Sequence, residues 1–388
     1  MRTLTARTVA PRTLSGKLAG IDWSVPILAA LIATVGAAAL YSMAGGRFEP
    51  WAGRHALRAA LGLAFMLAVA LVPMRFWFKI AYPFYMAVLG LLVAVPLIGV
   101  AQLGARRWLG AGDLSFQPAE LMKIALVLAL ARHYQRLRPE RISHPAWVAL
   151  PLAAIALPVG LVLKQPDLGT AILLLLTGLG VMFLAGVRPL YFSVGALVAA
   201  GCGHAVWPYL QDYQRRRLLT FLEPDRDPLG AGYHIAQSKI ALGSGGIQGR
   251  GFLGGTQSQL NFLPEKHTDF IFTMFAEETG FVGALALMAL YAALIVCLVL
   301  IALRARATLG RLLAGGMAVV IGLHVSVNMS MVIGLAPVVG VPLPLVSYGG
   351  TSLLTLMFGL GLALSAHVHR ADQPVSEGFA TPWPRNYR

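Results

Sequence analysis

The stretch WSVPILAALIATVGAAALYSM, residues 23–43, sets the fold class of this chain. It contains no charged side chain, and a helix needs about 20 apolar residues to cross the hydrocarbon core of a bilayer. The run is too long for the core of a secretory signal peptide, and no small-residue cleavage site follows it. We therefore expect it to be a first membrane span, preceded by a basic tail, residues 1–20.

The composition of the whole chain is typical of a membrane protein. Hydrophobic residues make up 57% of the 388 residues and charged residues only 12%, whereas soluble proteins carry about 25% charged residues. The net charge of +15 agrees with the excess of Lys and Arg in cytoplasmic loops. No basic soluble domain is present, so nucleic-acid binding is not expected. Cys202 and Cys297 lie in apolar segments and indicate neither disulfides nor a metal cluster.

Ten segments are apolar enough, or nearly so, to cross the membrane. The fourth is short and amphipathic. The predicted fold is an all-α polytopic integral membrane protein with ten transmembrane helices and a large extracytoplasmic loop, about 211–269, between the seventh and eighth. The segments are roughly 23–43, 56–73, 80–100, 118–132, 146–163, 168–187, 189–210, 270–303, 312–334 and 350–367.

Loop charge orients these segments. A cytoplasmic N-terminus places the basic loops 132–145 and 304–311 in the cytoplasm, as the positive-inside rule requires. Ten spans return the C-terminus to the same side. We expect a membrane domain over residues 21–370 and a disordered cytoplasmic tail over residues 371–388.

Several ionisable side chains lie within or at the ends of predicted membrane spans, where burying a charge costs free energy. Glu120 and Lys123 share a helix face, as a functional pair or as an ion pair that lets a marginal helix insert. Asp167 and Asp269 begin the sixth and eighth spans, where a carboxylate can cap a helix or take part in chemistry. A further pair, Glu277 and Glu278, must find partners or be protonated.

The outer face is unusually basic. Its cations are either solvated loop surface or a clamp for an anionic, lipid-linked substrate such as a polyprenyl diphosphate. They are Arg106, Arg107, Lys164, Arg215, Arg216, Arg217, Arg226, Lys239, Arg250 and Lys266.

Two glycine-rich stretches interrupt the apolar pattern. GSGGIQGRGFLGG, residues 243–255, contains a formal G-x-G-x-x-G, but no strand precedes it, so we expect a tight turn or re-entrant backbone and not a dinucleotide site. GLAPVVGVPLPLVSYGG, residues 334–350, predicts irregular backbone that is buried in protein or lines a cavity. Broken segments of this kind also occur in transporters.

Four stretches together resemble the SEDS family of cell-wall polymerases, which comprises the RodA and FtsW proteins. The resemblance extends over residues 20–370, and QSKIALGSGG followed by GTQSQL resembles the RodA branch, which acts in cell elongation. Ala119 and Arg106 depart from residues more usual in the family. The stretches are GARRWLGAGDLSFQPAELMKIA (104–125), KQPDLGTAILL (164–174), DPLGAGYHIAQSKIALGSGGIQGRGFLGGTQSQLNFLPEKHTDFIF (227–272) and PVVGVPLPLVSYGG (337–350).

The resemblance implies glycosyl transfer at the outer leaflet of the cytoplasmic (inner) membrane. The enzyme would polymerise lipid II into β-1,4 glycan strands with inversion and release undecaprenyl diphosphate. The resemblance places the general base at Asp269 and catalytic support at Glu120 and Lys123, where Glu120 is expected to orient Lys123 or Asp269. His267, two residues before Asp269, is a rival base because the pKa of histidine lies near neutral pH. Expected substrate-binding residues are Arg106, Arg107, Trp108, Gln117, Lys239, Lys266 and His267.

The sequence does not decide whether the protein uses a metal cofactor. A divalent cation, Mg or Mn, could share the stabilisation of the diphosphate, although no dedicated metal site is evident.

The expected partners are a class B penicillin-binding protein, which is a transpeptidase, and other membrane proteins of the elongation complex. Two other functions remain open: a flippase for lipid II, and a non-catalytic scaffold of the elongation complex. A flippase in which Asp269 only caps a helix should tolerate its replacement by Asn, whereas a polymerase should lose turnover. A scaffold should tolerate neutralisation of the basic outer face.

Overall fold

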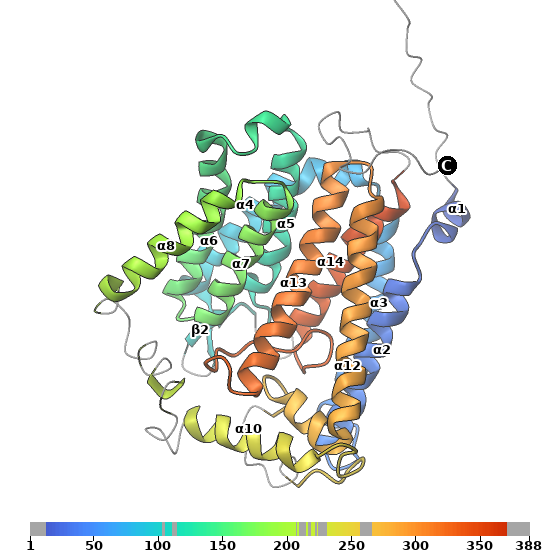
Figure 1. Cartoon of the computed structure of the whole chain (residues 1–388). Coiled ribbons are helices and arrows are strands. Elements are labelled where there is room, and N and C mark those ends of the chain that lie inside the picture. The colour runs from blue at the N-terminus through green and yellow to red at the C-terminus, as the bar shows by residue number, and fades with distance from the viewer. Residues whose placement is uncertain are drawn as a thin grey trace, which may run out of the picture.

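A computed structural model describes residues 13–102, 105–110, 115–206, 231–256 and 266–370, with a few single positions between 207 and 230. The two terminal tails beyond residues 13 and 370, and the cations Arg216, Arg217 and Arg226, lie outside the described residues. The described part is almost entirely helical (Figure 1).

Each predicted span coincides with a helix, which confirms the all-α membrane class. Among the described residues, seven helices are long and apolar enough to cross a bilayer. Helix α7 and the apolar part of α8 are shorter, and α5 carries Glu120, Lys123 and Arg132. The count of ten membrane-crossing helices therefore stays a prediction. The helices are α2 (Ser24–Met43), α3 (Ala52–Leu71), α4 (Met74–Ile98), α5 (Pro118–Gln135), α6 (Pro145–Lys164), α7 (Leu168–Leu184), α8 (Pro189–Val206), α12 (Ile271–Arg304), α13 (Thr308–Val332) and α14 (Gly350–Val368).

Helix α5 lies inside the bundle, where it packs against α4, α7, α13 and α14. Nearly all of its residues are buried, so it is not the one-sided, amphipathic helix that the sequence suggested. A polar face on a helix buried on all sides must be satisfied by other helices. This position brings Glu120 and Lys123 into the protein interior.

Regular structure also forms in segments that were expected to be loop. Strands β1 (Val100–Gln102) and β2 (Ala105–Trp108) form an antiparallel hairpin after α4, which the all-helical prediction omitted. Helix α10 (Ala231–Gly245) lies within the predicted long loop. Short helices α1 (Leu14–Ala19) and η2 (Pro139–Arg141) complete the described elements. Figure 1 places α10 and β2 at one end of the bundle and α1 at the other.

The glycine-rich stretch after α10 forms the tight turn predicted for it. Gly249 has φ +80°, and a Cβ on it would lie 2.1 Å from the backbone oxygen of Glu278. The backbone N–H groups of Arg250 and Gly251 donate to the carbonyls of Glu277 and Glu278, beside a kink at Gly280 in α12. The turn therefore packs directly on α12, the helix that begins just after Asp269.

The buried carboxylate pair in α12 has hydrogen-bond donors, as expected. Glu277 accepts from the backbone N–H and the hydroxyl of Thr256, at 2.9 and 3.0 Å. Glu278 accepts from the Ser42 hydroxyl at 2.5 Å. These bonds tie α12 to the outer loop and to α2.

Candidate functional site

The segment Lys266–Phe270, which precedes α12, is enclosed by the irregular stretch 334–350. The Tyr348 N–H donates to the His267 carbonyl at 2.9 Å, and the Ser347 hydroxyl donates to the Thr268 carbonyl at 2.6 Å. The broken stretch is thus held against the segment that carries Asp269, and its buried residues include Val339, Val341 and Leu343. This confirms the expectation that irregular backbone here is buried in protein.

Asp269 is held through its backbone by α13. The Asn328 side-chain amide donates to the carbonyls of Asp269, at 2.9 Å, and Val341, at 2.7 Å. A Cβ on Gly340 would lie 3.4 Å from the Asp269 Oδ2 atom, so the carboxylate lies over a glycine. The residue Asp269 is partly exposed, which agrees with a group that must reach a substrate.

The two candidate caps differ. Asp167 is the N-cap of α7 and accepts from the N–H and hydroxyl of Thr170, at 3.2 and 2.9 Å; the amide of Gln117 also donates to it at 2.9 Å. Asp269 is not the N-cap of α12, because that position is Phe270 and has no side-chain capping bond. The capping interpretation is therefore confirmed for Asp167 and wrong for Asp269.

Aromatic rings surround the residues before Asp269. The His267 ring stacks on Trp51 with a centroid distance of 5.0 Å and an interplanar angle of 12°. The Lys266 ammonium lies 5.9 Å from the centroid of Trp51, and Tyr348 lies 6.0 Å from the His267 ring. Lys266 is buried, and loss of solvation lowers the pKa of its ammonium. A cation in a site of this kind interacts strongly with an incoming anion.

Sequence reasoning missed three residues of this cluster. Trp51 and Tyr348 contact His267, and the Arg58 guanidinium lies 5.2 Å from the Tyr348 centroid. Tyr348 lies in a stretch already singled out for its broken backbone, so its position was the available signal. Nothing local in the sequence pointed to Trp51, because it reaches the site from the start of α3.

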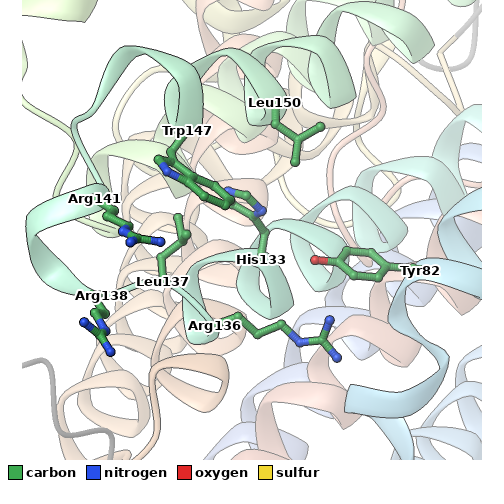
Figure 2. Close-up of a pocket in the computed structure, with 8 residues that line it drawn as sticks. All are labelled: Tyr82, His133, Arg136, Leu137, Arg138, Arg141, Trp147 and Leu150. Atoms are coloured by element: carbon green, nitrogen blue, oxygen red, sulfur yellow. The ribbon is translucent and has the colours of Figure 1, made fainter.

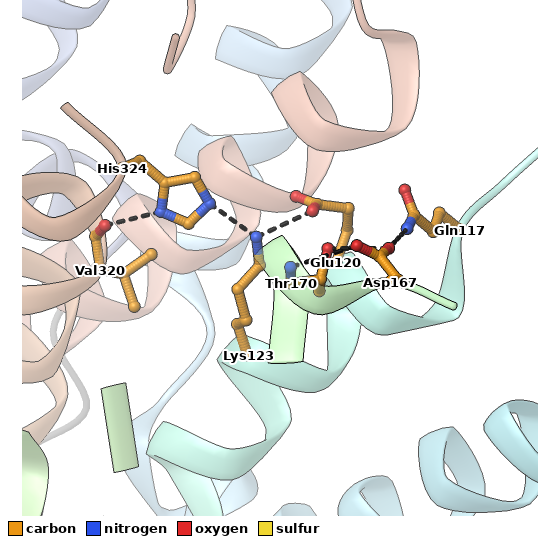
Figure 3. Close-up of polar contacts among 7 residues, drawn as sticks. All are labelled: Gln117, Glu120, Lys123, Asp167, Thr170, Val320 and His324. Carbon is orange, nitrogen blue, oxygen red and sulfur yellow. Dashed lines mark hydrogen bonds and ion pairs between the residues drawn. The ribbon is translucent and has the colours of Figure 1, made fainter. Parts of the chain in front are cut away.

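A second polar cluster lies in the protein interior (Figure 3). The Lys123 ammonium donates to Glu120 at 2.8 Å and lies 2.6 Å from the Nε2 atom of His324. The Nδ1 atom of His324 lies 2.7 Å from the Val320 carbonyl, so Nδ1 carries the proton and Nε2 accepts from Lys123. The ion pair between Glu120 and Lys123 is therefore confirmed, while the expectation that Glu120 orients Lys123 or Asp269 for catalysis stays a prediction.

Helix α13 links the two clusters. His324, which contacts Lys123, and Asn328, which holds Asp269, are separated by four residues. Residues at this spacing are neighbours on one helix face. The buried charge cluster therefore lies about one helical turn along α13 from the anchor of Asp269.

The remaining predicted residues lie at the same end of the bundle, in the hairpin and in α10. Arg107 donates to the backbone carbonyls of Gln165 and Pro166, so it joins the hairpin to the turn before α7. Arg106 is exposed on β2, beside the partly buried Trp108. Lys239 is exposed on α10, with its ammonium close to Gly334. Their roles in substrate binding stay predictions.

Metal ligation has no obvious place in the described residues. No group of three or more His, Cys, Asp or Glu side chains there is arranged to hold a metal ion. The described side chains therefore form no dedicated metal site.

One family of known proteins matches this chain along nearly its whole length. The profile of a family described as "Cell cycle protein", covering FtsW, RodA and SpoVE, matches residues 22–372. Peptidoglycan glycosyltransferase MrdB of Escherichia coli K12 is 49% identical over 313 residues, which is 80% of this chain and 84% of MrdB. A probable peptidoglycan glycosyltransferase FtsW of Geobacter metallireducens is 36% identical over 83% of this chain and 86% of its own length.

Two solved structures are similar over almost their full length. A chain from a peptidoglycan synthase complex that coordinates polymerization and crosslinking superposes with a TM-score of 0.78 at 38% identity, covering 91% of this chain and 99% of that one. The rod shape determining protein RodA of Thermus thermophilus superposes with a TM-score of 0.68 at 33% identity, covering 90% of this chain and 97% of its own.

Proposed function

Because this chain belongs to the FtsW, RodA and SpoVE family of cell cycle proteins, we propose that it is a peptidoglycan glycosyltransferase that polymerises lipid II into β-1,4-linked glycan strands. The observation that carries the assignment of the base is the placement of Asp269. It is partly exposed, it does not cap α12, and its backbone is fixed by Asn328 and the broken stretch. These properties suit a carboxylate that receives a proton from a substrate.

The reaction needs one base and stabilisation of one leaving group. Asp269 takes the proton of the 4-hydroxyl of one sugar as that oxygen attacks the anomeric carbon of the growing strand. The bond from the anomeric carbon to the diphosphate oxygen breaks, the configuration inverts, and undecaprenyl diphosphate leaves with the bonding electrons. A diphosphate is a good leaving group, so no acid is required. A positioned base contributes about 10²–10⁴-fold to the rate.

Cations near the site would stabilise the departing diphosphate. Lys266 is the best placed, because it is buried three residues before Asp269 and electrostatic stabilisation is strongest in a site that excludes water. Glu120 and Lys123 support the site from the interior through α13. Sharing of this stabilisation with a divalent cation stays a proposal that no residue cluster in the described part supports.

The orientation and the partner belong to the same proposal. Both termini would be cytoplasmic and the site would face the outer leaflet, since the basic loops 132–145 and 304–311 lie at the end opposite α10. A class B penicillin-binding protein would use the strands for crosslinking. The support is the similarity to a chain of a complex in which polymerization and crosslinking are coordinated.

The test is polymerisation of labelled lipid II by the purified chain, alone and with a cognate class B penicillin-binding protein whose transpeptidase is blocked. Asp269→Asn and Asp269→Ala are compared with Asp22→Asn, which alters a carboxylate that accepts from the Ser24 N–H at the start of α2. We expect glycan ladders from the wild type and Asp22→Asn, and none from the Asp269 variants, although these still bind lipid II.

Other results would change the assignment. Ladders from every variant would remove Asp269 as the base and make His267 and Glu120 the next candidates. Binding of lipid II without any ladder would favour the flippase, whose supporting observations are the broken stretch 334–350 and the kink at Gly280. Translocation of lipid II across vesicles would then be measured.

A further inference from the structure

A cavity of about 370 Å³ lies at the end of α5 that is remote from Asp269. Figure 2 shows its walls, which come from α4, the end of α5, the connection 136–141 that contains η2, and the start of α6. The cavity falls within the range of about 300–1,000 Å³ that is usual for small-molecule sites. It is independent of the glycosyltransferase chemistry, because Glu120 lies near the opposite end of the same helix.

Arginines dominate the polar wall of this cavity. Arg136, Arg138 and Arg141 line it, and none of them forms an ion pair with a carboxylate of the described residues. Arg141 lies 5.9 Å from the centroid of Trp147, and Arg136 lies 5.2 Å from that of Phe78. The aromatic rings fix the direction of the guanidinium groups and leave their N–H donors available to an anion.

Basic residues alone would not make a site here. Cations are favoured at the C-terminal end of a helix and in cytoplasmic loops. The independent observation is His133, which lines the cavity, is only 8% exposed and has a buried Nε2 atom without a hydrogen-bond partner in the described structure. A buried polar atom normally has a partner, so this nitrogen points to a ligand, because the described residues supply no partner for it.

A second cavity adjoins the first and is apolar. It has a volume of about 240 Å³ and shares Tyr82, His133 and Leu150 with the first cavity. Its other walls are mainly apolar side chains of α4, α5 and α6, among them Met86, Leu130 and Pro151. An arginine-rich cavity and an apolar cavity thus lie side by side, and this arrangement suits an amphiphile with an anionic headgroup.

We propose that these cavities bind an acidic phospholipid from the leaflet that adjoins this end of the bundle. The phosphate accepts hydrogen bonds from Arg136 and Arg141, and His133 donates through Nε2, while part of an acyl chain occupies the apolar cavity. Guanidinium groups match phosphate oxygens in geometry and charge, and basic pockets between helices on the cytoplasmic side suit acidic headgroups.

The test measures lipid retention by the full chain with native mass spectrometry after reconstitution with phosphatidylglycerol or phosphatidylcholine. The variant is Arg136→Gln with Arg141→Gln. The matched control is Arg304→Gln with Arg306→Gln, which removes two exposed arginines from the other basic loop at this end of the bundle. Thermal unfolding in uncharged detergent checks that the variants are folded.

We expect the wild type and the control to retain phosphatidylglycerol in preference to phosphatidylcholine, and the variant to bind phosphatidylglycerol about tenfold more weakly. Glycerol 3-phosphate and inorganic phosphate are titrated separately. Binding of either of these as tight as that of the lipid would identify a soluble anion and overturn the lipid assignment. Equal retention of both lipids, or equal losses in the variant and the control, would overturn the site itself.

Discussion

Replacing Asn328 with Leu should slow glycan polymerisation strongly while the protein stays folded. The substitution keeps a similar volume but removes the two hydrogen bonds to the carbonyls of Asp269 and Val341. Each bond contributes about 0.5–1.5 kcal/mol net, so the loss is about 1–3 kcal/mol. The Oδ1 atom of Asn328 is buried without a partner in the described structure, and its removal offsets part of this cost.

The effect on catalysis follows from what those bonds hold. If these bonds fix the position of Asp269, their removal lowers the stabilisation of the transition state by most of their free energy. A decrease of about 1.4 kcal/mol slows the reaction about tenfold. We expect kcat for glycan polymerisation to fall about 10- to 100-fold with a small change in KM. Initial rates on labelled lipid II, at several concentrations, separate the two parameters.

The control for Asn328→Leu is Ser365→Ala. The Ser365 hydroxyl is buried and donates to the Val72 carbonyl at 2.6 Å, at the end of α3 that lies away from Trp51. This variant should lose stability of the same order but keep its turnover. Equal turnover in the two variants, relative to the wild type, would refute the role of Asn328 in positioning Asp269.

Two further results are expected. Lys123→Met should destabilise the protein by about 3–5 kcal/mol, because it leaves the buried Glu120 without its ion-pair partner. The double variant with Glu120→Gln should recover most of this stability, as measured by thermal unfolding. Additive losses in the double variant would contradict the pairing. Burial lowers the pKa of Lys266 below the ordinary 10.5. At a pH below the folded-state pKa, the buried charge therefore lowers the stability of the folded protein. This destabilisation disappears as the pH rises from the folded-state pKa toward 10.5, because the folded protein loses the proton first. Affinity for a lipid diphosphate should therefore fall with rising pH before an ordinary lysine would deprotonate, Lys266→Arg should move the fall to higher pH, and identical pH profiles would rule out Lys266 as the diphosphate cation.

Local sequence was sufficient for the membrane class and the helix positions. Each apolar run is a property of consecutive residues, and the bilayer thickness sets the length of a helix directly. The tight turn at Gly249 and the N-cap at Asp167 were also within reach, because both depend on neighbouring residues. The choice of Asp269 as the base came from the family resemblance, because its position at the start of a span left both a helix cap and a catalytic group open.

Tertiary structure decided the environment of those residues. His324 meets Lys123 although 201 residues separate them, and Trp51 reaches His267 from the start of α3. The burial of α5 on all sides, which makes Glu120 and Lys123 interior residues, likewise depends on the helices packed around it. Hydrophobic periodicity reports which face of a segment is apolar, but it does not specify which distant segment covers that face. The sequence therefore determined a helical membrane protein with candidate ionisable residues and the local pair Glu120–Lys123, and only the packing of distant helices showed which other groups meet them, such as His324.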